Sequence, residues 1–407
     1  MTDLQAPTPE TSGDTLSSLS VERGRCLVDH EIEDLIRQGH ILFPSGITHS
    51  PKDIQPASFQ PTLSGEAYVI DTETSGSLRP HRDFTLEQMV LQLPRYRKRQ
   101  IDVSSGAELK KGHTYLVRLQ ERFDLDPNIR VKCSPRSSTG RIFLRTRLLA
   151  DYSDCFDEVK YAPQSKGKYL GLWLLVQPLA FDTIVRAGQS LTQARFFTGY
   201  DSLLTESELK ALDQQKPLLL MPPLQAEIKD SDTRDGLQIN LDLEGFHTKK
   251  LVGLRTRHTT NTVDLQHVGV YDPHEFYEPV FVQDQGDTLV IPPGQCYLLY
   301  SREIVRIPPT HSAELQGRTH ISLDGDLHLA GFFDPGFEAH AVFEVRSNEQ
   351  GSITLHHGMP MSRFHFFRNT IPKHPYGSGT LGSHFQGQVG PQPPKCFKPL
   401  KYEYVRP

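Results

Sequence analysis

One short segment, residues 133–141, gathers hydroxyl groups, guanidinium groups and a glycine. Its candidate ligand-binding residues are Arg136, Ser137, Ser138, Gly140 and Arg141. The serines can donate hydrogen bonds to phosphate oxygens, and the arginines can add charge-assisted, bidentate contacts. The glycine lets the backbone approach a ligand closely, because it carries no Cβ atom. The segment therefore indicates a phosphate-binding loop, and an ordinary polar turn is the alternative that its composition leaves open.

A second segment, residues 333–345, places one carboxylate inside an apolar strand. It opens with a tight Asp-Pro-Gly turn at Asp334 and then alternates in polarity up to Glu344. A buried carboxylate without a partner has a raised pKa. Such a pKa suits a group that must both accept and donate a proton near neutral pH. Glu344 is thus a candidate general acid/base, and a structural glutamate that pairs with an arginine is the alternative.

A third segment, residues 376–390, contains five glycines with aromatic and amide side chains between them. A segment of this composition can order over a ligand as a lid. The alternative is a frayed tail of low complexity.

The elements that must position these segments are mostly strands. Short apolar and β-branched runs alternate with Gly and Pro turn signals, which predicts a mainly β fold of the barrel or jelly-roll type. Two helices are expected, one over residues 29–38 with Asp29 as its cap, and one that begins at Thr205 with a capping box to Glu208. The length of 407 residues predicts two domains, and a proline-rich stretch places their boundary near residue 214.

An internal repeat supports this division. The matching segments, in chain order, are 54–65 with 236–245, 111–117 with 293–299, 121–125 with 303–307, 136–138 with 318–320, and 186–188 with 356–358. The first copy has about ten extra residues near 158–168. Because the order is the same and the offset is nearly constant, we expect two diverged copies of one β fold.

Composition excludes several classes of function. The net charge of −5 gives no overall positive field for nucleic acid. The five cysteines are scattered without a CxxC pair, which argues against a disulfide framework and a structural zinc site. No apolar run is long enough for a membrane span, and residues 1–20 lack a secretory signal and are expected to be disordered. A cytoplasmic protein is expected.

Taken together, these segments resemble the dCTP deaminase family, a branch of the dUTPase-like fold. The resemblance rests on four stretches: Arg-Ser-Ser-x-Gly-Arg at 136–141, the turn and strand at 334–344, aromatic-Gln-Gly-Gln at 385–388, and Gln-Pro-Ala-Ser at 55–58. It covers most of residues 20–400 and implies a long form with two tandem dUTPase-like β-barrel or jelly-roll domains and a few short helices. The expected parts are a disordered tail (1–20), a domain with the phosphate loop (21–213), a domain with the catalytic glutamate (214–375) and a glycine-rich lid (376–407).

The resemblance implies hydrolysis of dCTP to dUTP and ammonia, a step in pyrimidine deoxynucleotide synthesis. Glu344 would be the general acid/base, while Ser137 and Arg141 would help to hold the triphosphate and the reacting water. The further substrate contacts that it implies are Arg136, Ser138, Gly140, Asp334, Tyr376 and Gln388. Mg²⁺ would accompany the triphosphate, with no zinc and no metal ligand from the protein. The expected partners are the nucleotides and further copies of the chain, in a homo-oligomer with sites between domains.

The sequence departs from the family because each copy retains only one part of the site. Thr319, His320 and Leu323 stand where the second copy would need the two serines and the last arginine of the loop. The strand at 171–176 has only apolar residues where Glu344 falls in the other copy. We therefore expect one composite site, in which the loop of the first domain meets Glu344, within one chain or between chains.

Other functions remain open at this point. A dUTP diphosphatase of the same fold would use an aspartate, such as Asp151 or Asp154, to activate water, although no clear uracil-binding hairpin is seen. A bifunctional deaminase and diphosphatase, a non-catalytic nucleotide-binding protein and a β-rich scaffold are further alternatives.

Overall fold

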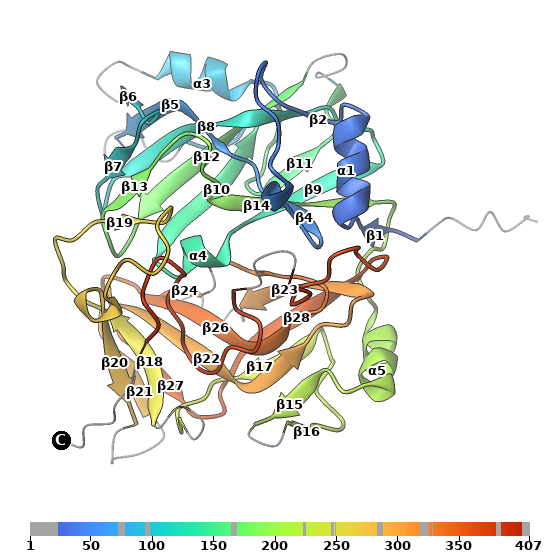
Figure 1. The fold of residues 1–407 in the computed structure, drawn as a ribbon, viewed down its shortest axis with the longest axis vertical. Helices are drawn as coiled ribbons and strands as arrows, with labels where there is room; N and C mark the ends of the chain where they lie inside the picture. The colour runs from blue at the N-terminus through green and yellow to red at the C-terminus, as the bar shows by residue number, and fades with distance from the viewer. Residues whose placement is uncertain are drawn as a thin grey trace, which may run out of the picture.

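The computed structural model describes residues 23–71, 78–93, 98–163, 169–222, 225–245, 248, 250–282, 288–317, 325–327, 329–379 and 384–400. The segment 1–20, which was expected to be disordered, lies outside these residues. The described chain is mainly β, as predicted, and its strands form two domains that lie one above the other in Figure 1. None of the helices in the described ranges is long and apolar enough to cross a membrane.

The first domain packs two β-sheets against each other. One sheet has the order β11 (Glu158–Lys160), β9 (Ile129–Pro135), β14 (Thr192–Thr198), β4 (Ser58–Phe59), β3 (Ile54–Gln55), and β1 (Arg25–Cys26) pairs with β14. The other has the order β10 (Leu144–Ala150), β12 (Leu170–Pro178), β8 (Thr114–Phe123), β5 (Leu63–Ile70), β6 (Lys98–Asp102), and β2 (Ile41–Leu42) pairs with β8. A small sheet joins β7 (Ala107–Leu109), β13 (Thr183–Val185) and β19 (Val263–Asp264).

The second domain repeats this arrangement. Its larger sheet has the order β16 (Ala226–Glu227), β15 (Leu219–Met221), β22 (Cys296–Arg306), β18 (Leu251–Thr256), β20 (Tyr277–Phe281), while β26 (Glu338–Ser347) pairs with both β22 and β24 (Gly325–Leu327). The facing sheet has the order β17 (Leu237–Asn240), β28 (Pro360–Arg368), β23 (His311–Gly317), β25 (Phe332–Phe333). The remaining pair is β21 (Thr288–Ile291) and β27 (Ile353–His356).

The strand order confirms the internal repeat. β10-β12-β8-β5-β6 in the first domain corresponds to β24-β26-β22-β18-β20 in the second. The central pairs β12·β8 and β26·β22 even interrupt their register at matching positions. Glu344 lies opposite Leu298, and the matching pair in the first domain is Leu175 opposite Leu116. Leu175 therefore occupies the place of Glu344 in the first copy.

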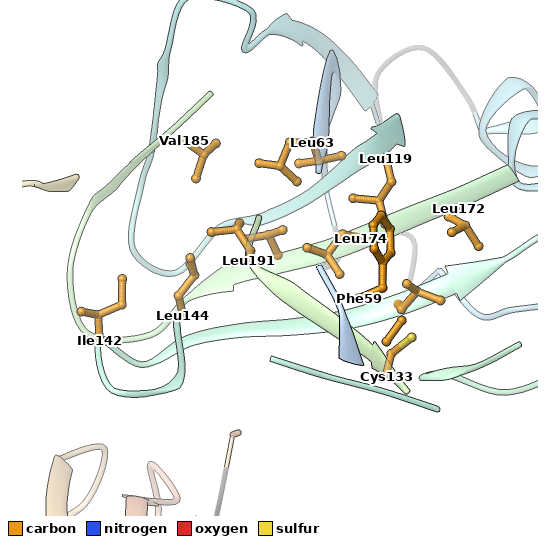
Figure 2. Close-up of a cluster of buried hydrophobic side chains, with 14 of the residues drawn as sticks. Phe59, Leu63, Leu119, Cys133, Ile142, Leu144, Leu172, Leu174, Val185 and Leu191 are labelled. Carbon is orange, nitrogen blue, oxygen red and sulfur yellow. The ribbon is translucent and has the colours of Figure 1, made fainter. Parts of the chain in front are cut away.

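The core of the first domain lies between its two sheets. Figure 2 shows apolar side chains from several strands that converge there, among them Leu119, Cys133, Leu172 and Leu174. Alternate residues of β12 face this interior because side chains of a strand alternate between its two faces. The same apolar cluster continues into the second domain through Leu254, Leu298 and other residues, so the two domains share a buried apolar contact.

The helices are short and lie at the edges of the sheets. They are α1 (Asp29–Arg37), α3 (Leu86–Gln92), α4 (Ser137–Gly140) and α5 (Glu206–Gln215). The expected capping box between Thr205 and Glu208 forms, and Leu209 of α5 packs in the hydrophobic core of the second domain. α1 begins as predicted, but its cap is Val28. The carboxylate of Asp29 accepts backbone hydrogen bonds from residues 373 and 374 instead.

Helix α3 distinguishes the first domain from the second. It lies between β5 and β6, whereas the matching connection of the second domain, residues 257–276, holds β19 and the 3-10 turn η4 (Pro273–Glu275). Leu86 and Val90 of α3 pack on Trp173 and Leu175 of β12. Figure 1 shows α3 at the end of the first domain that faces away from the second domain. The helix thus covers the face of β12 that corresponds to the Glu344 face of β26.

Candidate active site between the domains

A polar cavity of about 120 Å³ lies at the contact between the two domains, near α4 in Figure 1. Both domains and the glycine-rich segment line it. The lining residues are Gln55, Gln60, Arg136, Ser137, Ser138, Arg141, Gln193, Ala330, Phe332, Phe333, Asp334, Phe337, Val342, Glu344, Tyr376, His384, Phe385 and Lys395. One chain therefore brings the loop of the first domain and the strand carboxylate of the second to the same cavity.

Glu344 lies in the middle of β26 and is 2% exposed. Its Oε2 accepts hydrogen bonds from the backbone N–H groups of Leu329 and Ala330, with N···O distances of 3.2 and 3.4 Å. Burial raises the pKa of Glu344 to about 7, against the opposing effect of the Arg141 charge and these two donors. Among the described residues no Lys, Arg or His forms an ion pair with this carboxylate, so the structural alternative of a paired glutamate does not describe its surroundings.

The loop at 136–141 folds as the single helical turn α4 after β9. Its position is set by the end of β9, where Arg136 N–H donates to the carbonyl of Leu191 at 3.1 Å. Ser137 and Ser138 are partly exposed and face the cavity. Gly140 rests against the second domain, since a Cβ atom built on it would lie 2.8 Å from Oε1 of Glu344. A side chain at this position would force the Glu344 carboxylate or the loop to shift.

Arg141 is 4% exposed and is held by the glycine-rich segment. Its Nη1 donates to Oε1 of Gln388 at 2.9 Å and to the carbonyl of Gln392 at 2.8 Å. The Phe385 ring stacks on the guanidinium, with 3.5 Å between Cζ and the ring centroid. Burial lowers the pKa of Arg141 to about 10, which leaves it charged at neutral pH. Its Nε is buried without a hydrogen-bond partner in the described protein.

Arg136 contributes less directly to the cavity. Its Nη1 donates to the carbonyl of Ser190 at 3.1 Å, and burial lowers the pKa of its guanidinium. Lys395, whose pKa is also lowered by burial and by the nearby Arg136 charge, adds a second cation to the same wall. The cavity thus combines a positive wall with a buried carboxylate.

The predicted residues of the glycine-rich segment have different surroundings. Tyr376 lines the cavity, and its hydroxyl accepts a hydrogen bond from Phe385 N–H at 3.1 Å. Gln388 is 8% exposed and lies outside the cavity lining, because its amide joins Arg141 to the carbonyl of His340 at 2.7 Å. The structure therefore places Gln388 as a bridge between the domains. Residues 380–383 and 401–407 lie outside the described part of the segment.

Asp334 also lines the cavity and starts the expected Asp-Pro-Gly turn. Burial raises the pKa of its carboxyl, and Arg195 opposes that rise through a 3.2 Å contact. Sequence reasoning missed Arg195 because it lies within an apolar run of β14 and carries no motif signal. Gln55 could have been found, since it belongs to the Gln-Pro-Ala-Ser stretch, whereas Gln60 and Gln193 belong to no recognised pattern.

Several candidates lie away from the cavity or outside the described chain. Asp151 accepts hydrogen bonds from Leu86 N–H and Gly171 N–H, both at 2.8 Å, and so ties α3 to β12. Asp154 forms an exposed ion pair with Arg82. Thr319, His320 and Leu323, which replace the loop residues in the second copy, are outside the described residues. No group of three or more His, Cys, Asp or Glu side chains in the described ranges is arranged to hold a metal ion.

Comparison with known proteins gives a consistent result over both domains. The family model for the N-terminal domain of 2′-deoxycytidine 5′-triphosphate deaminase matches residues 23–200, and that for its C-terminal domain matches residues 205–391. The crystal structure of 2′-deoxycytidine 5′-triphosphate deaminase from Agrobacterium tumefaciens superposes with a TM-score of 0.75 and 29% identity. The match covers 85% of this chain and 99% of that one.

Curated relatives are similar over shorter stretches. A "dCTP deaminase, dUMP-forming" from a Nocardioides species is 36% identical over 121 residues, which is 29% of this chain and 63% of that protein. Another with the same name, from Corynebacterium jeikeium, is 33% identical over 140 residues, 34% of this chain and 74% of that protein. A third protein of that name, from Bifidobacterium animalis subsp. lactis, is 38% identical over 112 residues, 27% of this chain and 58% of that protein. The chain thus spans less than two thirds of the length of the Nocardioides and Bifidobacterium relatives.

Proposed function

The chain belongs to the 2′-deoxycytidine 5′-triphosphate (dCTP) deaminase family, and from this premise we propose that it hydrolyses dCTP to dUTP and ammonia. One observation carries the proposal. A carboxylate with a pKa near 7 and no ion-pair partner among the described residues lines the same cavity as the Arg-Ser-Ser-x-Gly-Arg loop. This combination pairs a group for proton transfer with groups for phosphate.

In this proposal Glu344 moves the protons of the reaction. As a carboxylate it accepts one proton from water while the water oxygen bonds to C4 of the cytosine ring. It then donates that proton to ring N3, which gives a tetrahedral intermediate with a hydroxyl and an amino group on C4. Glu344 next takes the hydroxyl proton and passes it to the amino group, so that the C4–N bond breaks and ammonia leaves as the carbonyl of uracil forms. One water is consumed for each ammonia released. A pKa near the working pH lets one group perform both transfers.

The loop of the first domain binds the triphosphate and orients the water. Ser137 and Ser138 donate to phosphate oxygens, and the charged guanidiniums of Arg136 and Arg141 balance the negative charge. The unpartnered Nε of Arg141 supports this role, because a ligand oxygen would satisfy a buried donor that is otherwise costly. Gly140 allows the loop to reach Glu344, and Asp334 and Tyr376 contact the nucleotide from the second domain. Gln388 acts through Arg141, which it holds in place.

Magnesium would arrive with the triphosphate. The carboxylates of the described lining are Asp334, which is paired with Arg195, and Glu344, which the proposal uses for proton transfer. These residues do not form a protein-held magnesium site, because Mg²⁺ needs several oxygen ligands in octahedral geometry. The ion would therefore be held by phosphate oxygens, and no step of the reaction depends on it here. We also propose a cytoplasmic location, which the scattered cysteines favour, and a homo-oligomer, which the resemblance implies.

A second candidate function is a bifunctional enzyme that converts dCTP to dUMP. The relatives from Nocardioides and Corynebacterium jeikeium are named "dCTP deaminase, dUMP-forming", which favours it. Such an enzyme would release pyrophosphate after ammonia, through attack of water on the α-phosphorus of dUTP.

Product analysis tests both candidates. The purified protein is incubated with dCTP, with and without Mg²⁺, and the nucleotides, ammonia and pyrophosphate are measured over time. Equal amounts of dUTP and ammonia support the proposal, whereas dUMP with pyrophosphate supports the bifunctional enzyme. Glu344→Gln should abolish ammonia release. Glu349→Gln is the control, because it replaces an exposed glutamate just after β26, and it should leave ammonia release unchanged. If the wild-type protein leaves dCTP unchanged, the proposed deaminase activity is wrong and a non-catalytic nucleotide-binding protein is the remaining candidate.

A further inference from the structure

We propose that Arg195 is a positioning residue of the active site, which reaches from the first domain into the second and fixes the Asp334 carboxylate against the cavity. This inference rests on the proposed function, because it concerns how the same site binds its nucleotide. Arg195 touches no cavity surface itself, since it is absent from the lining and 0% exposed. Its effect must therefore pass through the residues that it holds.

The burial of Arg195 needs an explanation. It lies on β14, opposite Lys132 of β9, and its neighbours Ala194 and Phe196 point into the core of the first domain. Arg195 therefore lies on the other face of the strand, where it is 0% exposed. Burying a guanidinium there is costly unless its donors are satisfied. An apolar residue would fill the contact between the domains at lower cost, so the arginine calls for a role besides packing.

Within the described ranges, the hydrogen-bond and ring partners of the guanidinium all belong to the second domain, and Nε has no partner. Nη1 donates to the carbonyl of Ala313 at 2.7 Å. Nη2 donates to the carbonyl of Phe333 at 2.7 Å and to Oδ1 of Asp334 at 3.2 Å. The Phe332 ring stacks on the same group, with 4.3 Å between Cζ and the ring centroid. Arg195 thus joins β23, β25 and the Asp-Pro-Gly turn from the opposite domain.

This contact uses one oxygen of the Asp334 carboxylate and leaves the other oxygen available to a ligand in the cavity. Oδ1 is engaged by Arg195, while Asp334 as a residue lines the cavity and has no other side-chain hydrogen bond among the described residues. Oδ2 is therefore available as an acceptor for a hydroxyl or amino group of the nucleotide. Burial raises the pKa of this carboxyl, and the guanidinium opposes that rise because it favours the ionised form. Asp334 and Glu344 line one cavity, yet only Asp334 has a cation partner.

A double-mutant cycle tests the inference on nucleotide binding rather than on turnover. In a Glu344→Gln background, the dissociation constant of dCTP is measured by calorimetry for Arg195→Met, Asp334→Asn and the pair. Arg195→Met should weaken binding roughly tenfold or more, the range for a lost hydrogen bond to a charged group. It should weaken binding less than about twofold further when Asp334→Asn is already present, as expected for coupled residues. Arg195→Lys, which keeps the charge, should recover part of the affinity.

Arg130→Met is the matched control. Arg130 lies on the adjacent strand β9, stacks on Phe197 at 5.6 Å and donates to Ser202 at 2.8 Å, but it contacts neither Asp334 nor the cavity. It should leave dCTP binding within about twofold of the parent, since it removes an arginine without a route to Asp334. In the active enzyme, Arg195→Lys should raise KM much more than it lowers kcat. As the pH is lowered, KM should begin to rise at a higher pH in this variant than in the wild type, because Asp334 is protonated more easily.

Equal loss of affinity from Arg195→Met with and without Asp334→Asn would overturn the inference and leave a purely structural arginine. Unchanged affinity in Arg195→Met would overturn it as well. If Arg195→Met does not fold, Arg195→Lys takes its place in the cycle with the same criteria. Failure of the proposed function looks different, because wild-type protein would then release no ammonia from dCTP while the binding cycle could still be measured.

Discussion

The α-carbon of Gly140 in the first domain lies directly against the carboxylate of Glu344 in the second, so closely that a Cβ atom would be 2.8 Å from Oε1. The contact joins residues that are 204 positions apart in sequence, by subtraction of their numbers. It sets how near the Arg-Ser-Ser-x-Gly-Arg loop comes to Glu344. The two halves of the site are thus in van der Waals contact before any ligand is considered.

Substitution Gly140→Ala should therefore damage catalysis without unfolding the protein. The added methyl group would also meet Ala330, at 3.0 Å from its Cβ, so the loop must retreat from Glu344. We expect kcat/KM to fall about 100-fold, since displacements near 1 Å in an active site have effects of this order. Steady-state ammonia release measures the change. Gly351→Ala is the control, because a Cβ there meets nothing within 4 Å; similar losses in both variants would contradict the argument.

The pH dependence of turnover should report Glu344. The carboxylate form accepts the proton from water, so activity requires the deprotonated group at the start of the reaction. Because burial raises the pKa of Glu344 to about 7, kcat/KM should increase with pH and reach half its plateau near pH 7. Rates of ammonia release from pH 5 to pH 9 test this. A flat profile over that range, or one that falls with increasing pH through 7, would remove Glu344 from the role of base.

Loss of the Phe385 ring should weaken substrate binding more than it slows chemistry. Phe385 stacks on Arg141, and interactions of this kind contribute about 0.5–2 kcal/mol. Phe385→Ala should therefore raise KM by roughly 2- to 30-fold, with a smaller change in kcat. Val389→Ala, at an exposed residue of the same segment, should have little effect on either constant. Equal effects of the two substitutions would indicate a general loosening of the segment.

Two buried glutamates, at matching positions of the two copies, should make the free energy of unfolding depend on pH. Glu121 accepts hydrogen bonds from N–H and Oγ1 of Thr62, and Glu303 accepts them from N–H and Nδ2 of Asn240. Burial raises the pKa of Glu121 to about 7 and raises that of Glu303. The folded state then binds protons more tightly than the unfolded state. The contribution of Glu121 to stability is therefore fully present below about pH 4.5, and this contribution is lost as the pH rises through 7.

Glu121→Gln tests that term because glutamine does not titrate. For a rise from 4.5 to about 7, the term amounts to about 3 kcal/mol. The substitution should cost stability at pH 5 and progressively less toward pH 8, where the wild type must hold a buried charge. Thermal unfolding at each pH measures the difference in Tm between the two proteins. A difference that stays constant from pH 5 to pH 8 would show that Glu121 does not titrate in this range.

The sequence predicts the elements of this molecule better than the contacts between them. Alternating apolar runs predict the strands because burial on one face imposes a period of two. The repeat predicts two copies of one sheet order because matching segments keep a constant offset. Glu344 could be singled out because a carboxylate in an apolar strand violates the expected pattern and so needs a reason.

The parts that escaped prediction depend on tertiary contacts. The sequence around Arg195 does not indicate that its partners lie more than a hundred residues away in the other domain. The motif predicts that Gln388 contacts the substrate, which stays a prediction, but it does not reveal that the same side chain accepts a hydrogen bond from Arg141, a contact set by the path of the final segment. Asp29 has the type and place of a helix cap, yet its carboxylate is used by residues 373 and 374.

The placement of α3 limits how this sequence can change. Leu175 stands where Glu344 stands in the second copy, and it packs against Leu86 and Val90. A glutamate introduced there would meet apolar side chains instead of water or substrate, and it would destabilise the first domain. A carboxylate at this position would reach a ligand only if α3 moved away. The two copies of the strand are therefore not interchangeable, since one position holds a helix in place and its counterpart faces a cavity.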